Sequence, residues 1–154
     1  NGLVDPIVQD KSYAPYLYAN GLIGKSTVRQ MDQAYAQCQQ DIEAGDYSDA
    51  FNDCNEILQI GLSAAGNINV YDIRKQCDGP LCYDFDNIVS YLAQPSVVNK
   101  LGVSGVSWTT CNSDVYQYLV NDFEYSYKFD LPKLLANNIR VLIYNGKFLF
   151  KLIV

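Results

Sequence analysis

Two cysteines five positions apart constrain the fold of this chain more than any other feature of its sequence. Cys77 and Cys82 enclose the residues DGPL in the stretch NVYDIRKQCDGPLCY, which runs from Asn69 to Tyr83. Glycine and proline favour a tight turn between the two thiols, whereas a zinc knuckle would need a different spacing and a second pair of ligands. We therefore expect a disulfide here. Tyr71 and Tyr83 flank the closed loop, where their rings can line an amphipathic pocket.

The part of the chain before this loop has the patterning of helices. Three segments each have an apolar side, and in the second and third the apolar residues recur at steps of three and four. The predicted boundaries are Asp5-Pro6 and Asn20-Gly21 for the first helix, Thr27 and Ala44-Gly45 for the second, and Asp46 and Leu62 for the third. Thr27 and Gln30 have the spacing of a capping box, and Asp46 is of the type that caps a helix.

Cys38 and Cys54 lie on the inward faces of the second and third predicted helices. The turn between these helices is short, so the two should pack antiparallel. The cysteines also lie at nearly equal distances from Asp46 in that turn. A disulfide between them is therefore geometrically natural. The alternative is a pair of unbonded cysteines in the core.

The part of the chain after the loop combines short helices with one strongly apolar run. Helices are expected at Asp86–Ala93, at Pro95–Leu101, from the cap Asn112 through Leu119, and at Leu131–Ala136. The run RVLIY at Arg140–Tyr144 is typical of the central parallel strands of α/β proteins, which are buried on both faces. A competing hypothesis starts from Asn145-Gly146, a strong signal for a type I′ hairpin, in which RVLIY would pair with KFLFKLIV.

Charge and cysteine content exclude several classes of partner. With a net charge of −6 and an isoelectric point near 4.4, this chain of 154 residues would repel the phosphates of nucleic acids and of anionic membranes. No apolar run approaches the roughly 20 residues needed to cross a bilayer. The cysteines number five, and outside the cytosol an odd thiol indicates a partner beyond the chain. The alternative is a reduced cytosolic protein with scattered buried cysteines.

The sequence contains no credible catalytic centre of its own. There is no histidine, which removes the commonest general base and the commonest metal ligand. The elbow Gly-x-Ser-x-Gly does not occur, and the nearest sequence, GVSG at Gly102–Gly105, is interpreted as a loop. Most acidic residues are better explained by helix starts and solvated faces than by a pair of carboxylates facing across a cleft. We therefore expect no catalytic residue, no metal site and no cofactor.

Six segments, taken in order, resemble the serine carboxypeptidases. They are NGLVDP, NGLIG, NVYDIRKQC with LCY, QPSVVNKLGV, SWTTCNSDV and LPKLLANNIRVLIYNG. The resemblance, carried by these segments and their order, extends over nearly all of residues 1–146. The resemblance implies an α/β fold, namely part of the α/β-hydrolase fold with a helical, disulfide-linked lid, and hydrolysis of peptide C-termini. It divides the chain into a core helix leading into the lid (residues 1–23), the helical lid hairpin (24–66) and a partial α/β-hydrolase core (67–154).

The resemblance also implies roles for three residues. Tyr71 and Tyr83 match positions that contribute to the pocket for the departing C-terminal residue of a peptide. Cys111 matches a cysteine that bonds to another far upstream, in a region absent from this sequence. The remainder of a parent chain, bonded through Cys111, is therefore an expected partner. A vacuolar, lysosomal or secreted location is expected.

The catalytic residues of the family do not fall within this chain. The nucleophilic serine would precede Asn1, the histidine would follow Val154, and the position of the aspartate is occupied by Leu149. We therefore expect the isolated chain to be inactive. With Arg140–Tyr144 uncovered, its C-terminal part should be loose or associate with another chain. The alternative is a non-catalytic binding or structural module derived from the carboxypeptidase lid.

Overall fold

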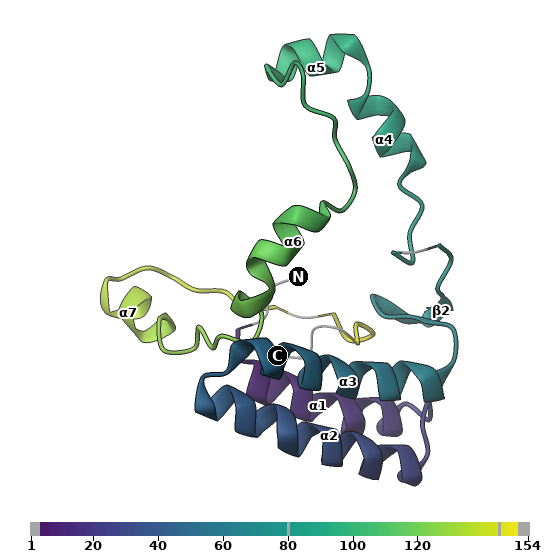
Figure 1. Ribbon diagram of the computed structural model, residues 1–154, viewed down its shortest axis with the longest axis vertical. Helices are drawn as coiled ribbons and strands as arrows, with labels where there is room; N and C mark the ends of the chain where they lie inside the picture. Colours follow the sequence, from purple (N-terminus) through teal and green to yellow (C-terminus); the bar gives the residue numbers. More distant parts are fainter. Residues whose placement is uncertain (1–3, 80, 145, 151–154) are drawn as a thin grey trace.

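Three helices packed side by side form the main layer of the protein. The structure, a computed structural model, describes residues 4–79, 81–144 and 146–150. The layer consists of α1 (Pro6–Ala19), α2 (Lys25–Ala44) and α3 (Tyr47–Ala65). Figure 1 shows α1 between the other two in this view, and all three helices contact one another. The three helical segments predicted from the sequence are therefore confirmed.

Local sequence explains how α2 ends and α3 begins. Gly45 follows α2 with a positive φ of 77°, a left-handed conformation in which glycine has no steric penalty. The side chain of Asp46 then accepts a hydrogen bond from the backbone N–H of Asp49 at 3.2 Å, so it caps α3 as predicted. These two residues reverse the chain and set α3 against α2.

The capping box predicted at Thr27 and Gln30 is wrong. α2 begins earlier, at Lys25, and Gly24 occupies the N-cap position in an extended conformation. Thr27 is therefore already inside the first turn of the helix, where its side chain is not at the capping position. Thr27 and Gln30 have the spacing of a capping box, but the helix starts three residues earlier than a cap at Thr27 would allow, because Gly24 serves as the N-cap. Glycine is also tolerated at that position.

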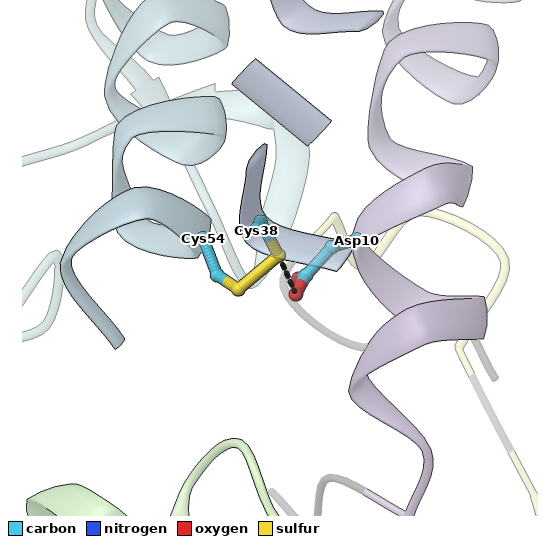
Figure 2. A group of neighbouring side chains, drawn as sticks. All are labelled: Asp10, Cys38 and Cys54. Atoms are coloured by element: carbon cyan, nitrogen blue, oxygen red, sulfur yellow. Dashed lines mark hydrogen bonds between the residues drawn. A yellow bond between two sulfur atoms is a disulfide. The ribbon is translucent and has the colours of Figure 1, made fainter. Parts of the chain in front are cut away.

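The hydrophobic core lies between the three helices. Its largest fully buried side chains include Leu17, Met31 and Ile57. Gly61 lets α3 approach closely, because a Cβ atom there would lie only 2.8 Å from Cδ1 of Leu17. The expected disulfide between Cys38 and Cys54 is present and crosses from α2 to α3, as Figure 2 shows.

A short antiparallel hairpin follows the helices. It consists of β1 (Ile68–Asn69) and β2 (Asp72–Gln76), with Ile68 opposite Gln76 and Asn69 opposite Asp72. The expected second disulfide, Cys77–Cys82, closes the loop directly after β2. The described part of the chain is thus mostly helical, with one sheet of two strands.

Short helices make up most of the rest of the chain. They are α4 (Asp86–Leu92), α5 (Pro95–Leu101), α6 (Ser113–Leu119), the 3-10 helix η1 (Val120–Asp122) and α7 (Leu131–Ala136). All of the expected short α-helices are therefore confirmed. The side chain of Asn112 caps α6 by accepting from two backbone N–H groups. In Figure 1, α4 and α5 extend away from the helical layer and α6 returns toward it, where η1 contacts α3.

Within the described ranges, no helix combines the length and the apolar character that crossing a bilayer requires.

The strand predicted at Arg140–Tyr144 does not form. None of these residues is in a strand, and Leu142 and Tyr144 are 82% and 86% exposed. A parallel strand needs neighbours on both sides and helices on both faces, and the described residues provide only the β1–β2 hairpin. The apolar pattern is real, but nothing in the described structure covers it. The parallel sheet of an α/β-hydrolase core is accordingly not seen in the described part of the chain.

The alternative hairpin is not supported either. Asn145 and residues 151–154, which it requires, lie outside the described residues. The described part of the tail instead runs beside the β1–β2 hairpin. The N–H of Ile73 donates to Phe148, and the N–H of Phe150 donates to Val70, both at 3.0 Å. Phe150 is fully buried, with its ring centroid 4.9 Å from that of Tyr13 on α1. The tail therefore packs on the helical layer.

Candidate functional site

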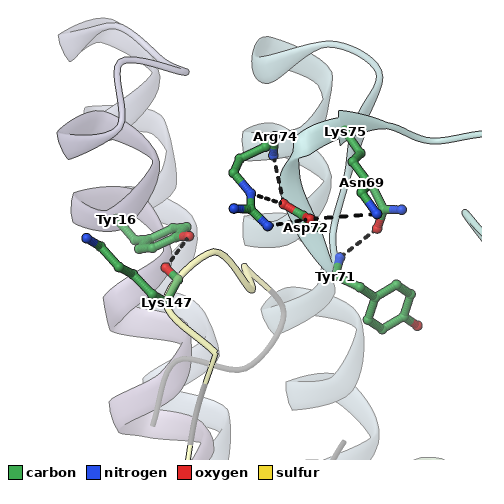
Figure 3. A network of polar contacts seen from close by, with 7 residues as sticks. All are labelled: Tyr16, Asn69, Tyr71, Asp72, Arg74, Lys75 and Lys147. Carbon is green, nitrogen blue, oxygen red and sulfur yellow. Dashed lines mark hydrogen bonds and ion pairs between the residues drawn. The ribbon is translucent and has the colours of Figure 1, made fainter.

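The β1–β2 hairpin and the Cys77–Cys82 loop are held together by the buried side chain of Asn69. Its amide nitrogen donates to the backbone oxygen of Cys82 at 3.0 Å, and its amide oxygen accepts from the N–H of Tyr71 at 2.8 Å. Figure 3 shows the second of these contacts. A single polar residue thus fixes both tyrosine-bearing segments relative to each other.

Tyr71 and Tyr83, the two residues predicted to bind substrate, are in contact. Their ring centroids lie 5.5 Å apart, and the ring of Phe85 lies 6.4 Å from that of Tyr83 in an edge-to-face arrangement. Such tilted and edge-to-face pairs are favoured by the charge distribution of aromatic rings. Tyr83 remains exposed while Tyr71 is half-buried. The three rings form one aromatic cluster beside the disulfide loop.

An open pocket of about 850 Å³ lies next to this cluster. Tyr83 and Phe85 supply its aromatic wall, and Asn69 and Cys82 also line it, whereas Tyr71 reaches it only through its contact with Tyr83. The remaining lining residues are mostly polar or charged: Lys75, Gln76, Asp78, Gly79, Asp84 and Asp86. A ligand here would meet aromatic surface on one side and charged groups on the other.

The disulfide fixes the wall of this pocket. Cys82 has a φ of 59°, a left-handed conformation that is uncommon for residues other than glycine. Its N–H donates to Gly79 at 3.2 Å across the turn, while Asn69 binds its carbonyl oxygen. The covalent bond to Cys77 and these hydrogen bonds together hold Cys82 in that conformation, and Tyr83 follows directly.

A charged network stabilises the other face of the hairpin, as Figure 3 shows. Arg74 donates to both carboxylate oxygens of Asp72, at 2.8 and 2.9 Å, and Lys75 lies 4.0 Å away from the same group. These hydrogen bonds from Arg74 lower the pKa of the Asp72 carboxyl to about 2. Arg74 also stacks over the ring of Phe148 at 4.0 Å. The network joins the hairpin to the C-terminal tail.

A second cluster of potential ligand atoms lies in the helical core, but it does not fit a metal. Atoms of Asp10, Cys38 and Cys54 lie within 4.8 Å of one another, as Figure 2 shows. Metals bind cysteine as the thiolate, and here the two sulfurs are bonded to each other. The cluster therefore has one carboxyl as its only available ligand.

The other predicted positions are spread over the structure. Cys111 is exposed and has no disulfide partner among the described residues. Leu149 is half-buried, and its N–H donates to Gly146 at 3.2 Å. Sequence reasoning missed Asn69 and Phe85. Asn69 could have been found, because an asparagine at the start of a turn often accepts a hydrogen bond from the backbone N–H two residues further on. Phe85 lies two residues beyond Tyr83.

Comparisons with known proteins give one consistent result. The family model described as serine carboxypeptidase matches residues 1–149. Serine carboxypeptidase-like 48 of Arabidopsis thaliana is 38% identical over 96% of this chain and 31% of its own length. Serine carboxypeptidase S10 family member 1 of Dictyostelium discoideum is 37% identical over 96% of this chain and 36% of its own length. A serine carboxypeptidase-like protein of Pisum sativum is 35% identical over 96% of this chain and 54% of its own length. No solved structure matches this chain. The chain thus spans about a third of the length of the first two relatives.

Proposed function

This chain belongs to the serine carboxypeptidase family, and we propose that it forms part of a longer protein that releases C-terminal residues from peptides. The observation that carries the proposal is the match to the family over residues 1–149, nearly the whole chain. In such an enzyme a serine attacks the carbonyl of the last peptide bond, the C-terminal amino acid leaves, and water hydrolyses the acyl-enzyme. We propose that none of the groups carrying out these steps comes from this chain.

The proposed role of this chain is to shape the pocket for the departing amino acid. The Tyr83 and Phe85 rings form an aromatic wall beside an open pocket. An apolar C-terminal side chain bound there would bury its surface against this wall, which favours binding. Asn69 and the Cys77–Cys82 disulfide position that wall. Tyr71 supports it from its contact with Tyr83.

We further propose that the chain contributes the lid and part of an α/β-hydrolase core. The α2–α3 pair with its disulfide is the proposed lid. Val141, Leu142, Ile143 and Tyr144 are all exposed, and we propose that they form a strand when the remainder of the longer protein supplies its neighbours. Cys111, exposed and unbonded among the described residues, is the proposed covalent link to that remainder. The two disulfides support an oxidising location, vacuolar, lysosomal or secreted.

Leu149 favours a second candidate function. It occupies the position at which the family resemblance places the catalytic aspartate, and a leucine cannot orient and stabilise a catalytic histidine. A chain with this replacement fits a non-catalytic binding or structural module built on the carboxypeptidase lid. In that case the pocket beside Tyr83 would bind peptide C-termini without cleaving them.

The full-length transcript, followed by an assay of its product, separates the two functions. A Gly-x-Ser-x-Gly motif upstream and a histidine downstream, with release of the last residue from a blocked dipeptide, would support the peptidase. A stop codon directly after Val154, or a product that binds the dipeptide without turnover, would support the module. The 154-residue chain alone is expected to cleave neither the blocked dipeptide nor a p-nitrophenyl ester. Activity that survives repurification and disappears on substituting one of its residues would contradict both.

A further inference from the structure

Two carboxyl groups are buried in and beside the helical core, and among the described residues neither has a positively charged partner. Asp10 on α1 is 5% exposed, and Glu124, which follows η1, is 7% exposed. Within the described ranges neither takes part in an ion pair. The Oε2 atom of Glu124 also has no hydrogen-bond partner among the described residues. Burying an unpaired carboxylate is strongly unfavourable, so such groups tend to take up a proton instead.

The surroundings of Asp10 also favour the protonated form. Its Oδ2 atom lies 3.7 Å from Sγ of Cys38, and Figure 2 shows this contact next to the α2–α3 disulfide. A sulfur in a disulfide carries no hydrogen. A hydrogen bond across this contact therefore requires Asp10 to be protonated and to donate to the sulfur, which is a weak acceptor.

In the described part of the chain, no positively charged group is found to act on Asp10. The tyrosine hydroxyls of Tyr13 and Tyr35 are neutral, and both have raised pKa values, first through burial and then through the charge of Asp10. The ammonium group of Lys11 lies 6.0 Å from the ring of Tyr35, and that of Lys128 is bound to Asp5 at 2.8 Å. Among the described residues, the titratable groups that interact electrostatically with Asp10 are Tyr13, Tyr35 and Glu124, and Tyr35 is in turn neighboured by Asp5, Lys11 and Glu43.

We propose that Asp10, in contact with the α2–α3 disulfide, and the buried Glu124 form an acid-stabilised lock. While both carboxyls are protonated, they hold α1 and the segment after η1 against the α2–α3 pair. As they ionise toward neutral pH, these segments separate from the pair and the disulfide becomes accessible. The proposal concerns the folding of this chain and does not depend on the proposed peptidase activity.

The direction of the pH dependence follows from where the protons are bound. Burial, and then the charge of Glu124, raises the pKa of Asp10 to about 8, and burial raises the pKa of Glu124 to about 7. In the unfolded chain both carboxyls titrate near about pH 4. The folded chain therefore holds more protons than the unfolded chain between these values. The stability that these two carboxyls contribute is fully present at low pH and falls as the pH rises toward about 8.

The size of the effect is large enough to measure. Between the unfolded and folded pKa values, each carboxyl lowers the ratio of folded to unfolded chain by roughly tenfold per pH unit. From about pH 5 to about pH 7, Asp10 alone should lower this ratio roughly a hundredfold. Because Glu124 contributes to the raised pKa of Asp10, the two effects should not be additive, and removing Glu124 should weaken the response of Asp10.

The test compares urea unfolding of the intact disulfide form at about pH 5 and about pH 7. Asp10→Asn keeps the shape of a protonated aspartate and can still donate to the Cys38 sulfur, and Glu124→Gln is the equivalent change. Both variants should be about as stable as the wild type at acid pH. At neutral pH their ratio of folded to unfolded chain should exceed that of the wild type by roughly tenfold or more. The matched control is Asp32→Asn, on an exposed face of α2, which should follow wild type at both pH values.

Equal pH dependence in wild type, Asp10→Asn and Glu124→Gln would overturn the proposal. So would a variant that loses the same stability at both pH values, because that result indicates a packing role only. If a variant does not fold, a carboxyl carbon NMR titration of the wild-type chain decides instead. Two carboxyls that titrate near pH 7 and pH 8 are expected. Titration of every carboxyl below about pH 5 would contradict the lock.

Discussion

Replacing Phe150 with alanine should release the C-terminal tail from the helical layer. The Phe150 side chain is fully buried, and its ring lies 4.9 Å from the ring of Tyr13 and 6.1 Å from that of Tyr16 between centroids. Replacing a buried phenylalanine with alanine typically lowers stability by about 3–5 kcal/mol. The tail is held otherwise by a few hydrogen bonds, each contributing about 0.5–1.5 kcal/mol, and by the stacking of Arg74 over Phe148, which contributes about 0.5–1 kcal/mol. The aromatic contact is therefore the larger part of what keeps the tail in place.

Amide hydrogen exchange measures this release locally. The N–H of Ile73 donates to Phe148, and the N–H of Phe150 donates to Val70, so both amides are protected only while the tail is docked. A loss of about 3 kcal/mol corresponds to roughly 150-fold faster exchange. The amides in the middle of α2 should exchange as in the wild type, because the disulfide and the helix pair do not depend on the tail.

Phe129→Ala is the matched control. Phe129 is 70% exposed, and substitutions at such positions usually change stability by no more than about 0.5 kcal/mol. If the Ile73 amide exchanged as slowly in Phe150→Ala as in the wild type, the Phe150 ring would not be what holds the tail. Release of the tail to the same extent in Phe129→Ala would contradict a specific role of Phe150 as well.

Three further predictions concern the cysteines, the exposed run and the helix contact. Non-reducing peptide mapping should recover both disulfides of the structure and an alkylatable Cys111, and a bond from Cys111 to any of the other four cysteines would contradict the fold. Hydrogen exchange at Val141–Tyr144 should be fast in a dilute monomer, and slow exchange there would show that the run is covered. Gly61→Ala should lower the free energy of unfolding by about 1 kcal/mol in urea. Its Cβ would lie 2.8 Å from Leu17 and 3.0 Å from Met31, overpacking costs about 1–3 kcal/mol, and the gain in helix propensity offsets about 1 kcal/mol of that. An unchanged or increased stability would show that the core relaxes freely around the added methyl group.

Local signals predicted the helices because the deciding contacts are local. Asp46 and Asn112 cap helices through hydrogen bonds to residues two or three positions away. The disulfide between Cys38 and Cys54 could be predicted because the turn between their helices is short, so the two cysteines lie opposite each other on antiparallel helices. The burial of Asp10 could also have been anticipated, since it lies three residues after Ile7 and three before Tyr13, on the apolar side of the first helix.

Long-range packing is what the sequence pattern could not specify. The apolar run at Arg140–Tyr144 is typical of a strand that is buried on both faces. The pattern does not show whether the neighbouring strands that would bury it are present. The docking of Phe150 on α1 joins residues far apart in the chain, and no periodicity links them. The contact between Tyr71 and Tyr83 lies between these cases, because the short disulfide loop brings the two segments together. Their role in binding a substrate stays a prediction.

The pocket wall at Tyr83 can be tested directly in the full-length protein. Tyr83→Ala removes the ring that lines the pocket, and Tyr118→Ala, at a side chain that is 90% exposed, is the control. A blocked dipeptide ending in phenylalanine and one ending in glycine are compared by their kcat/KM values. Losing the contact with a large apolar side chain removes about 1.5–3 kcal/mol of binding, so kcat/KM for the phenylalanine substrate should fall by tenfold or more. The value for the glycine substrate should change little. Equal kcat/KM values for Tyr83→Ala and wild type on the phenylalanine substrate would contradict the assignment of this pocket to the departing residue.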